Sequence, residues 1–288
     1  MAAPFSEECK TVDHAMGTVC IPANPERIVA LDPRYLGDPL LSLGVQPVAI
    51  AVYQDQGQEG LAGLTPEATE PLKDIGNAQN PSLEKIVEID PDLILALDFA
   101  HEAIYDQLSA IAPTVLLEYD LETFEKYPSF KENLRRIAQL LGKETEADTV
   151  LSQYQTRIDQ LREQLDRKPE DIEVTVLLHY GGMFGIPHPE HTSHEIFSDI
   201  GITDNINTAR TDAISLEALD QYDADILFIM DYDRKEISFF LENPIIASLD
   251  AVKNNRVYFI NADTWSANGP LGVNRMLDDL FQYLPAQS

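Results

Sequence analysis

Basic residues are scarce in this sequence. Its 288 residues include 20 Lys and Arg against 49 Asp and Glu, which gives a formal net charge of -29. Proteins that bind nucleic acid, or anionic lipid through charge, need a basic stripe or patch, and the sequence offers none. Both partner classes are therefore excluded. The acidic composition indicates a solvated surface, which favours a monomer.

Long apolar runs are also missing. No stretch approaches the roughly 18 consecutive apolar residues of a membrane helix, and the longest runs, such as 93–97, have the length and composition of strands. The N-terminus has no basic region followed by an apolar core, so it does not have the features of a signal peptide. The 44% hydrophobic content suffices for one large or two medium globular domains.

Common enzyme motifs are absent as well. There is no G-x-S-x-G elbow, no P-loop and no G-x-G-x-x-G after a predicted strand, so we expect no enzyme. One alternative is a metal-dependent α/β hydrolase built on His188, His191 and His194, whose spacing could bind zinc. Two neighbouring prolines favour an ordinary surface loop at this position, with no direct metal site.

Cysteine is limited to Cys9 and Cys20. They lie in two alternating stretches on either side of Gly17, which predict a small hairpin that a disulfide could close. An even cysteine count fits an oxidising compartment, but two free thiols in a cytosolic protein fit the composition equally well. The residues alone leave both alternatives open.

The order of the predicted elements indicates an α/β fold. Short apolar strands alternate with helical segments, among them a helix that begins after Ser82 and a closing amphipathic helix at 274–284. The predicted strands are 27–31, 45–52, 93–97, 112–117, 174–178, 225–230 and 256–260. This alternation predicts mostly parallel sheets with helices on both faces.

A nearly continuous helical pattern separates two halves of the chain. Apolar residues recur at helical spacing from about 130 to 165, interrupted at Gly142. Such a helix would be roughly 50 Å long and would suit a rigid strut, whereas the pattern lacks the strict heptads of a coiled coil. The predicted domains are an N-terminal hairpin (1–24), an α/β lobe (25–129), a long linking helix (130–168) and a second α/β lobe (169–288).

The two predicted lobes share a sequence echo. Glu84 stands eight residues before Asp92, as Glu217 stands eight residues before Asp225. Each Glu follows a Ser-Leu pair in a predicted helix, and each Asp directly precedes a predicted strand. The echo predicts two related lobes, and paired α/β lobes place a ligand cleft between them, at the carboxyl ends of the strands.

Six segments in a fixed order extend this interpretation. They include Asn24-Pro-Glu-Arg-Ile-Val-Ala-Leu and Ile111-Ala-Pro-Thr-Val, and the others are 82–95, 130–143, 243–253 and 256–265. Together they resemble the ferric siderophore-binding proteins of ABC importers, over nearly the whole chain from about residue 12 to 284. The N-terminal hairpin is most similar to that of cyanobacterial and related bacterial members.

The resemblance implies location, ligand and partner. It implies an exported protein, periplasmic or otherwise extracytoplasmic, with lipid anchoring of the full-length precursor left open. It implies an iron(III)–siderophore complex as ligand, no cofactor, an ABC permease of the inner membrane as partner, and a Cys9–Cys20 disulfide. Glu84 and Glu217 resemble the acidic pair that docks onto permease arginines, one from each lobe. The alternative is a pair of ordinary first-turn carboxylates favoured by the helix dipole.

The iron of such a chelate is already coordinated, so the protein needs aromatic walls and cationic or hydrogen-bonding groups rather than metal ligands. Residues of these kinds follow the predicted strand ends, and the resemblance adds an arginine in the loop 207–212. The candidate ligand-binding residues are Arg34, Tyr53, His179, Tyr180, Arg210, Tyr232 and Trp265. Core packing is the alternative for Trp265, and a hydrogen-bonded structural role is the alternative for His179.

The scarcity of basic residues also bears on the kind of chelate. Catecholate complexes are highly negative and need clustered cations, so we expect a hydroxamate or citrate–hydroxamate siderophore. The alternative within the same importer class is haem or a corrinoid, with Tyr180 or His179 as an axial ligand to haem. A visible spectrum separates these: a charge-transfer band for a ferric siderophore, a Soret band for haem, and neither for a zinc hydrolase.

Overall fold

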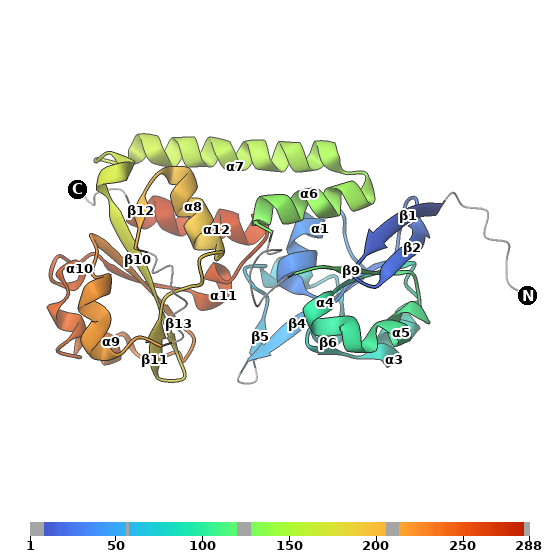
Figure 1. Cartoon of the computed structure of the whole chain (residues 1–288), viewed down its shortest axis with the longest axis horizontal. Helices are drawn as coiled ribbons and strands as arrows, with labels where there is room; N and C mark the ends of the chain where they lie inside the picture. Colours follow the sequence, from blue (N-terminus) through green and yellow to red (C-terminus); the bar gives the residue numbers. More distant parts are fainter. Residues whose placement is uncertain (1–8, 56–57, 120–127, 206–212, 285–288) are drawn as a thin grey trace, which may run out of the picture. The chain divides into compact units, whose positions relative to one another are not determined.

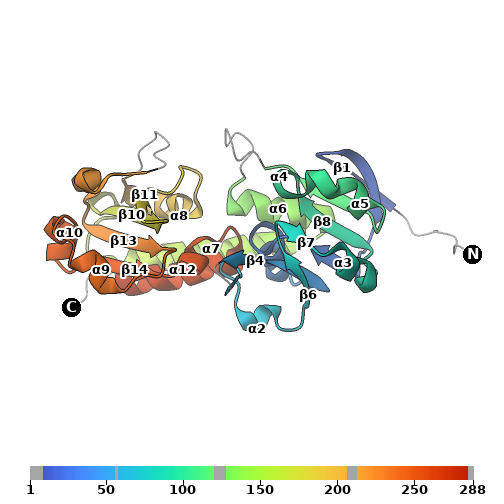
Figure 2. The ribbon, with the colours of Figure 1, turned by 90° about the horizontal axis from the view of Figure 1, so that it is seen from below.

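The computed structural model describes residues 9–55, 58–119, 128–205 and 213–284. The chain forms two compact units: unit 1 comprises Met1–Ser152 and Ala267–Val273, and unit 2 comprises Gln153–Ser266 and Asn274–Ser288. Each unit is a largely parallel sheet flanked by helices (Figures 1 and 2), which confirms the predicted α/β fold class. No helix within the described ranges is both long and apolar enough to span a bilayer.

The sheet of unit 1 has the strand order β7-β6-β4-β3-β8-β9, with β5 paired to β4. Its strands are β3 (Ile28–Ala30), β4 (Ala49–Asp55), β5 (Gln58–Gly60), β6 (Lys73–Asn77), β7 (Asn80–Pro81), β8 (Leu93–Leu97) and β9 (Thr114–Leu117). The pairs β3/β4, β3/β8, β4/β6 and β8/β9 are parallel. The carboxyl ends of these strands therefore meet at one edge of the sheet.

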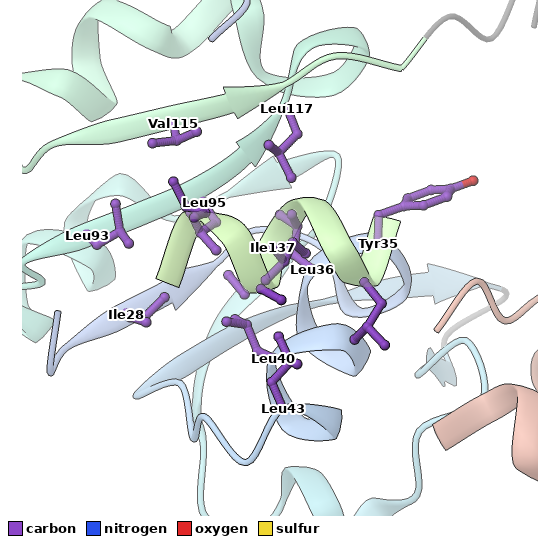
Figure 3. Close-up of a cluster of buried hydrophobic side chains, with 14 of the residues drawn as sticks. Ile28, Tyr35, Leu36, Leu40, Leu43, Leu93, Leu95, Val115, Leu117 and Ile137 are labelled. Carbon is purple, nitrogen blue, oxygen red and sulfur yellow. The ribbon is translucent and has the colours of Figure 1, made fainter. Parts of the chain in front are cut away.

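Strand alternation divides the apolar residues of unit 1 between two cores. Ile28 and Ala30 belong to one cluster, whereas Val29 and Leu31 belong to the other. Figure 3 shows the first cluster, in which side chains from α1 and α6 pack against β8 and β9. The helices of unit 1 are the π-helix η1 (Pro33–Gly37), α1 (Asp38–Ser42), α2 (Pro66–Thr69), α3 (Leu83–Ile89), α4 (Asp98–His101), η2 (Glu102–Ile104), α5 (Tyr105–Ser109) and α6 (Phe130–Leu141).

The sheet of unit 2 has the order β11-β10-β13-β14, with β12 paired to β10. Its strands are β10 (Glu173–Tyr180), β11 (Met183–Gly185), β12 (Thr203–Asp204), β13 (Ile226–Asp231) and β14 (Val257–Ile260). Leu227 and Ile229 face a core that includes Phe240 of α9, while Phe228 stacks on Phe197 of α8. The other elements are η3 (Pro169–Asp171), α8 (Thr192–Ile200), η4 (Leu216–Tyr222), α9 (Ile237–Leu241), η5 (Ile246–Ser248), α10 (Asp250–Lys253) and α11 (Ala262–Trp265).

The nearly continuous helix predicted from about 130 to 165, with an interruption at Gly142, is two separate helices. Gly142 adopts a left-handed conformation (φ +67°), open to glycine at no steric cost, and ends α6; α7 then begins at Glu144 and runs to Gln164. The 21 residues of α7 span about 31 Å at the standard rise. The chain passes between the units three times: within α7, between Ser266 and Ala267, and within α12 (Pro270–Tyr283). That α7 is a rigid connector stays a prediction.

The aspartates of the repeated pattern, Asp92 and Asp225, have the same structural role in the two units. Asp92 accepts the backbone N–H groups of Glu26 and Arg27, just before β3. Asp225 likewise accepts the N–H of Glu173, the first residue of β10. Each aspartate thus fixes the start of the neighbouring parallel strand. The helix before it differs between the units: α3 is an α-helix capped by Ser82, whereas η4 is a 3₁₀-helix without a side-chain cap.

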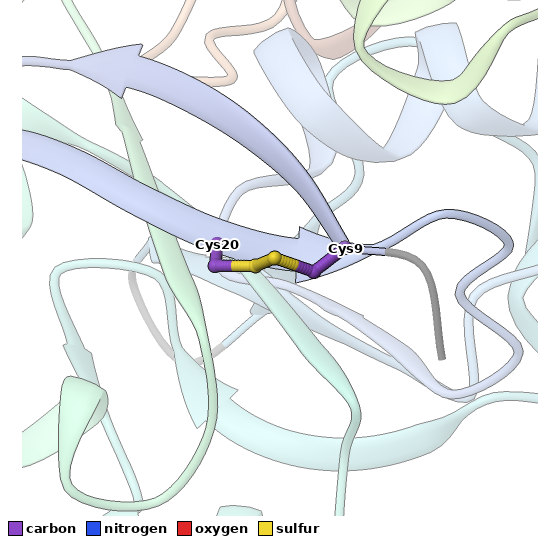
Figure 4. Close-up of a disulfide and its surroundings, with 2 residues drawn as sticks. All are labelled: Cys9 and Cys20. Atoms are coloured by element: carbon purple, nitrogen blue, oxygen red, sulfur yellow. A yellow bond between two sulfur atoms is a disulfide. The ribbon is translucent and has the colours of Figure 1, made fainter. Parts of the chain in front are cut away.

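The N-terminal hairpin consists of β1 (Cys9–His14) and β2 (Gly17–Pro22). Cys9 and Cys20 form a disulfide with their Cα atoms 5.6 Å apart, as predicted (Figure 4). Ile21 is buried in the first core cluster of unit 1. The hairpin is therefore packed onto the lobe, and it is not an independent domain.

A buried carboxylate holds the start of α12 within unit 1. Asp38 is fully buried and accepts the N–H groups of Leu271 at 2.9 Å and Gly272 at 2.8 Å, together with the Ser42 hydroxyl. A side chain at Gly269 would collide with this carboxyl group. Burial raises the pKa of Asp38 to about 6, against the opposing effect of its three hydrogen bonds.

Candidate functional site

The carboxyl edge of the sheet in unit 1 holds an arginine between two tyrosines. Arg34 and Tyr35 lie in η1, directly after β3, and Tyr53 lies in the neighbouring strand β4. The Cζ atom of Arg34 is 5.5 Å from the ring centroid of Tyr35 and 5.3 Å from that of Tyr53. These are cation–π distances. The structure thus brings together two of the predicted site residues, Arg34 and Tyr53.

Asp32 holds Tyr35 and Tyr53 in place around Arg34. Its buried carboxyl group accepts the Tyr35 N–H at 2.7 Å, capping η1, and also accepts the Tyr53 hydroxyl. Burial raises the pKa of Asp32, and these two hydrogen bonds act in the opposite direction. Because both acceptor oxygens are used, Asp32 orients Tyr35 and Tyr53 around Arg34.

The same edge carries further groups that the sequence analysis missed. The ring of Tyr119, just after β9, is 4.7 Å from that of Tyr35, and Phe99, just after β8, is 6.2 Å from both. Phe99 is 45% exposed, so this aromatic cluster reaches solvent. Arg136 of α6 lies over Tyr119, with its Cζ 5.6 Å from the ring centroid. The strand-end rule could have found Phe99 and Tyr119, whereas Arg136 has no comparable signal in the sequence.

Unit 2 presents a smaller polar and aromatic edge. Tyr180 ends β10 and Tyr232 follows β13, and their rings meet edge to face at 6.0 Å. Tyr180 is 63% exposed, and Met183, its partner across the β10–β11 hairpin, is also exposed. The Tyr232 hydroxyl lies 2.8 Å from the Ser266 hydroxyl. Two more predicted residues, Tyr180 and Tyr232, are therefore neighbours.

His179 is buried, contrary to the prediction that it contacts ligand. Its Nδ1 lies 2.7 Å from the Asp231 carboxylate, and its ring is enclosed by Phe184, Phe239 and Phe240 at centroid distances of 5.0 to 5.4 Å. Its side chain has no exposed surface. It cannot serve as an axial ligand without unpacking this aromatic core, so the structural alternative holds for His179.

Trp265 is also part of the core of unit 2. Its side chain is fully buried against Phe228, at a centroid distance of 5.1 Å, and Phe197, at 6.3 Å. Its indole Nε1 donates to the Asp279 carboxylate at 2.8 Å. The prediction that Trp265 faces the ligand needs correction. After β14, helix α11 directs this residue into the core of unit 2. Arg210, the other residue expected to dominate binding, lies outside the described residues.

The three histidines at the start of α8 have other partners. His194 is buried and hydrogen-bonded to Asp204. His191 lies 2.8 Å from the Ser193 hydroxyl, at the N-terminus of the helix. Within the described parts of the chain, no group of three or more His, Cys, Asp or Glu side chains could hold a metal ion. His191 and His194 thus make local hydrogen bonds, and the ring of His188 lies 5.7 Å from that of His191.

Glu84 and Glu217 are exposed in the first turns of α3 and η4. One turn beyond Glu84, Val87 leaves 57% of its surface exposed. Two corresponding positions, one in each unit, therefore present an exposed carboxylate to solvent. This geometry suits a partner that carries cations, and it also fits the ordinary first-turn preference of acidic residues.

Comparison with known proteins decides the family. A model of the periplasmic binding protein family matches residues 28–264. The chain belongs to this family. Its members are solute carriers rather than enzymes, which agrees with the expectation from the sequence.

Similar proteins include a ferric citrate-binding protein and siderophore-binding proteins. The Bacillus subtilis Fe(3+)-citrate-binding protein YfmC is 30% identical over 263 residues, covering 91% of this chain and 81% of YfmC. The probable siderophore-binding lipoprotein YfiY of the same species is 31% identical, covering 96% and 88% of the two chains. The crystal structure of Staphylococcus aureus SirA complexed with staphyloferrin B matches with a TM-score of 0.76 and 28% identity, covering 96% of this chain and 98% of SirA.

Proposed function

We propose that this periplasmic binding protein captures a ferric siderophore and delivers it to the permease of an ABC importer. The observation that carries the proposal is the carboxyl edge of unit 1, where Arg34 lies between Tyr35 and Tyr53 and joins an exposed aromatic cluster. The Tyr180–Tyr232 pair at the corresponding edge of unit 2 supports it. These groups supply aromatic contact and cations without metal ligands, which suits iron that is already coordinated.

The class of chelate we propose is hydroxamate or citrate–hydroxamate. The net charge of -29 and the few cations at the described edges disfavour a highly anionic catecholate complex. The relatives support iron as the cargo, since their names include a ferric citrate binder and a siderophore binder. Of the two candidate axial ligands to haem, His179 is enclosed and paired with Asp231, whereas Tyr180 is exposed.

Delivery to the permease would use Glu84 and Glu217. Their exposure, and their equivalent places in the two units, support docking onto a cationic surface, where a carboxylate–guanidinium pair fixes orientation as well as attraction. We propose that the protein acts as a monomer outside the cytoplasmic membrane, in the periplasm or held at the membrane by a lipid anchor. The lipoprotein YfiY supports such an extracytoplasmic location.

Titration with a panel of ferric siderophores tests the proposal. Trp265 is the single tryptophan, and ferric chelates absorb light near its emission, so binding should quench its fluorescence even though the ring does not touch the ligand. The visible spectrum of the complex should show the charge-transfer band of the chelate and no new Soret band with haem. Absence of saturable binding to every hydroxamate, citrate and mixed chelate would refute the proposed function.

A further inference from the structure

We infer that the carboxyl edge of unit 1 recognises a free carboxylate of the ferric ligand, through Arg34 and Arg136. This deepens the proposed function and rests on it. The inference selects the citrate-containing member of the two proposed ligand classes over a neutral hydroxamate. It also assigns a role to Arg136, a residue of α6 that no sequence motif indicated.

The two arginines flank a pair of tyrosine rings that contact each other at an interplanar angle of 51°. Arg34 lies over Tyr35 at 5.5 Å, Tyr35 meets Tyr119 at 4.7 Å, and Arg136 lies over Tyr119 at 5.6 Å. Both rings are packed into the core of unit 1 and are 4% and 2% exposed. Tyr35 and Tyr119 therefore form a rigid base that sets the separation of the two guanidinium groups. In Figure 3 the Tyr35 hydroxyl points away from the aliphatic cluster.

Asp32 attracts Arg34 electrostatically, but no acidic side chain among the described residues forms an ion pair with either arginine. The carboxyl oxygens of Asp32 accept from Tyr35 and Tyr53, and Asp98 accepts the backbone N–H groups of Phe99 and Tyr119. Among the described residues, neither arginine is within 4 Å of a carboxylate oxygen. Two cations without ion-pair partners are unusual in a chain with 49 acidic residues.

Each guanidinium also retains hydrogen-bonding capacity. The Nε of Arg34 is buried and has no acceptor among the described residues, and Arg136 uses one amino group, donating to the Glu118 carbonyl at 3.2 Å. A guanidinium offers five N–H donors in a planar fork. Carboxylate is the group that matches this fork with two parallel hydrogen bonds. Phe99 supplies an exposed apolar surface beside it for the rest of the chelate.

Calorimetric titration of the full chain with two probes tests the inference. The probes are ferric citrate, prepared with excess citrate, and a neutral ferric trihydroxamate. Arg34→Gln and Arg136→Gln should each weaken ferric citrate binding by about 10- to 100-fold, the equivalent of one lost charge-assisted contact. Arg34→Lys keeps the charge but loses the planar fork, so it should give an intermediate loss. The matched control is Arg135→Gln, which removes the same charge from an exposed neighbouring position of α6 and should change neither affinity.

The outcomes separate this inference from the proposed function. Wild-type protein that binds the trihydroxamate and not ferric citrate would overturn the inference and keep the function. An equal loss of affinity for both probes in Arg136→Gln would also overturn the inference, because Arg136 would then maintain the structure of the site without recognising the carboxylate. Unchanged ferric citrate affinity in both glutamine variants would do the same. If Arg34→Gln fails to fold, as judged by circular dichroism, Arg136→Gln on the partly exposed helix decides. A wild-type protein that binds no ferric chelate would instead refute the proposed function.

Discussion

Replacing Trp265 by phenylalanine should destabilise unit 2 without weakening ligand binding. The substitution removes the Nε1–H that donates to Asp279 at 2.8 Å and leaves a void beside Phe228, because the indole is fully buried. A hydrogen bond to a charged group contributes about 1.5–3 kcal/mol, and the lost ring volume adds to that. We therefore expect a decrease in the free energy of unfolding of about 2–4 kcal/mol.

The effect should also depend on pH. Burial raises the pKa of Asp279, and the indole N–H opposes that rise, so removing the N–H should raise the pKa further. The hydrogen bond favours the ionised carboxylate, so its loss should cost more at pH 7.5 than at a pH low enough to protonate Asp279. Urea unfolding followed by far-ultraviolet circular dichroism at the two pH values measures this. An equal decrease in the free energy of unfolding at the two pH values would contradict the assigned role of the Trp265–Asp279 hydrogen bond.

The matched variant is Tyr180→Ala, which should behave in the opposite way. Tyr180 is 63% exposed, so its removal should change the free energy of unfolding by about 0.5 kcal/mol or less. In the proposed site it provides aromatic contact, and ferric chelate affinity should fall several-fold in a calorimetric titration. If Trp265→Phe lost affinity while Tyr180→Ala did not, the assignment of core and ligand-facing residues in unit 2 would be reversed.

Three further changes have defined outcomes. Reduction of the Cys9–Cys20 disulfide, or its replacement by serine, should lower the free energy of unfolding by about 3 kcal/mol, since the bridge closes a loop of 11 residues; an unchanged urea midpoint would refute this. Replacing Glu84 and Glu217 together by glutamine should leave chelate affinity unchanged and reduce iron uptake by cells, and a loss of affinity would show that they are not docking residues. The pKa of Asp38 rises from 3.8 to about 6 on folding. Protonated Asp38 therefore stabilises the folded protein by about 3 kcal/mol below pH 4, and this stabilisation is lost as the pH rises through 6. Asp38→Asn should remove that loss, and a pH-independent difference between wild type and variant, in urea unfolding from pH 4 to 7, would contradict it.

The fold was largely predictable because its strands carry continuous apolar runs and its helices carry local end signals. The run 93–97 became β8, and Ser82 caps α3 as its position predicted. The helical runs on both sides of Gly142 were predicted, but not the full break between them, which the left-handed conformation of this glycine produces at the end of α6. The 3₁₀ form of η4 was also not predictable, since its sequence echoes that of α3 while Ser215 makes no capping hydrogen bond.

The candidate site was predicted less completely than the fold. The rule that ligand residues follow strand ends identified Arg34 and Tyr53, whose proximity comes from the parallel pairing of β3 and β4. It could not identify Arg136, because α6 reaches this edge through packing of its apolar face and not through any local pattern. Nor could it reveal that Asp32 orients the two tyrosines around Arg34, since this depends on a hydrogen bond between residues 21 positions apart.

The same rule chose wrongly where it ignored which face of the sheet a side chain occupies. Side chains alternate between the two faces of a strand, so consecutive residues at a strand end have opposite surroundings. His179 therefore enters a core of phenylalanines while Tyr180, the next residue, is exposed. In β10 the sequence does not reveal which phase is buried, because Val174 and Val176 are buried on one face and Leu177, in phase with His179, is buried on the other. Where both faces of a strand are apolar, the packing of neighbouring elements decides which terminal residue is buried, and here Phe184, Phe239 and Phe240 enclose His179 and leave Tyr180 exposed.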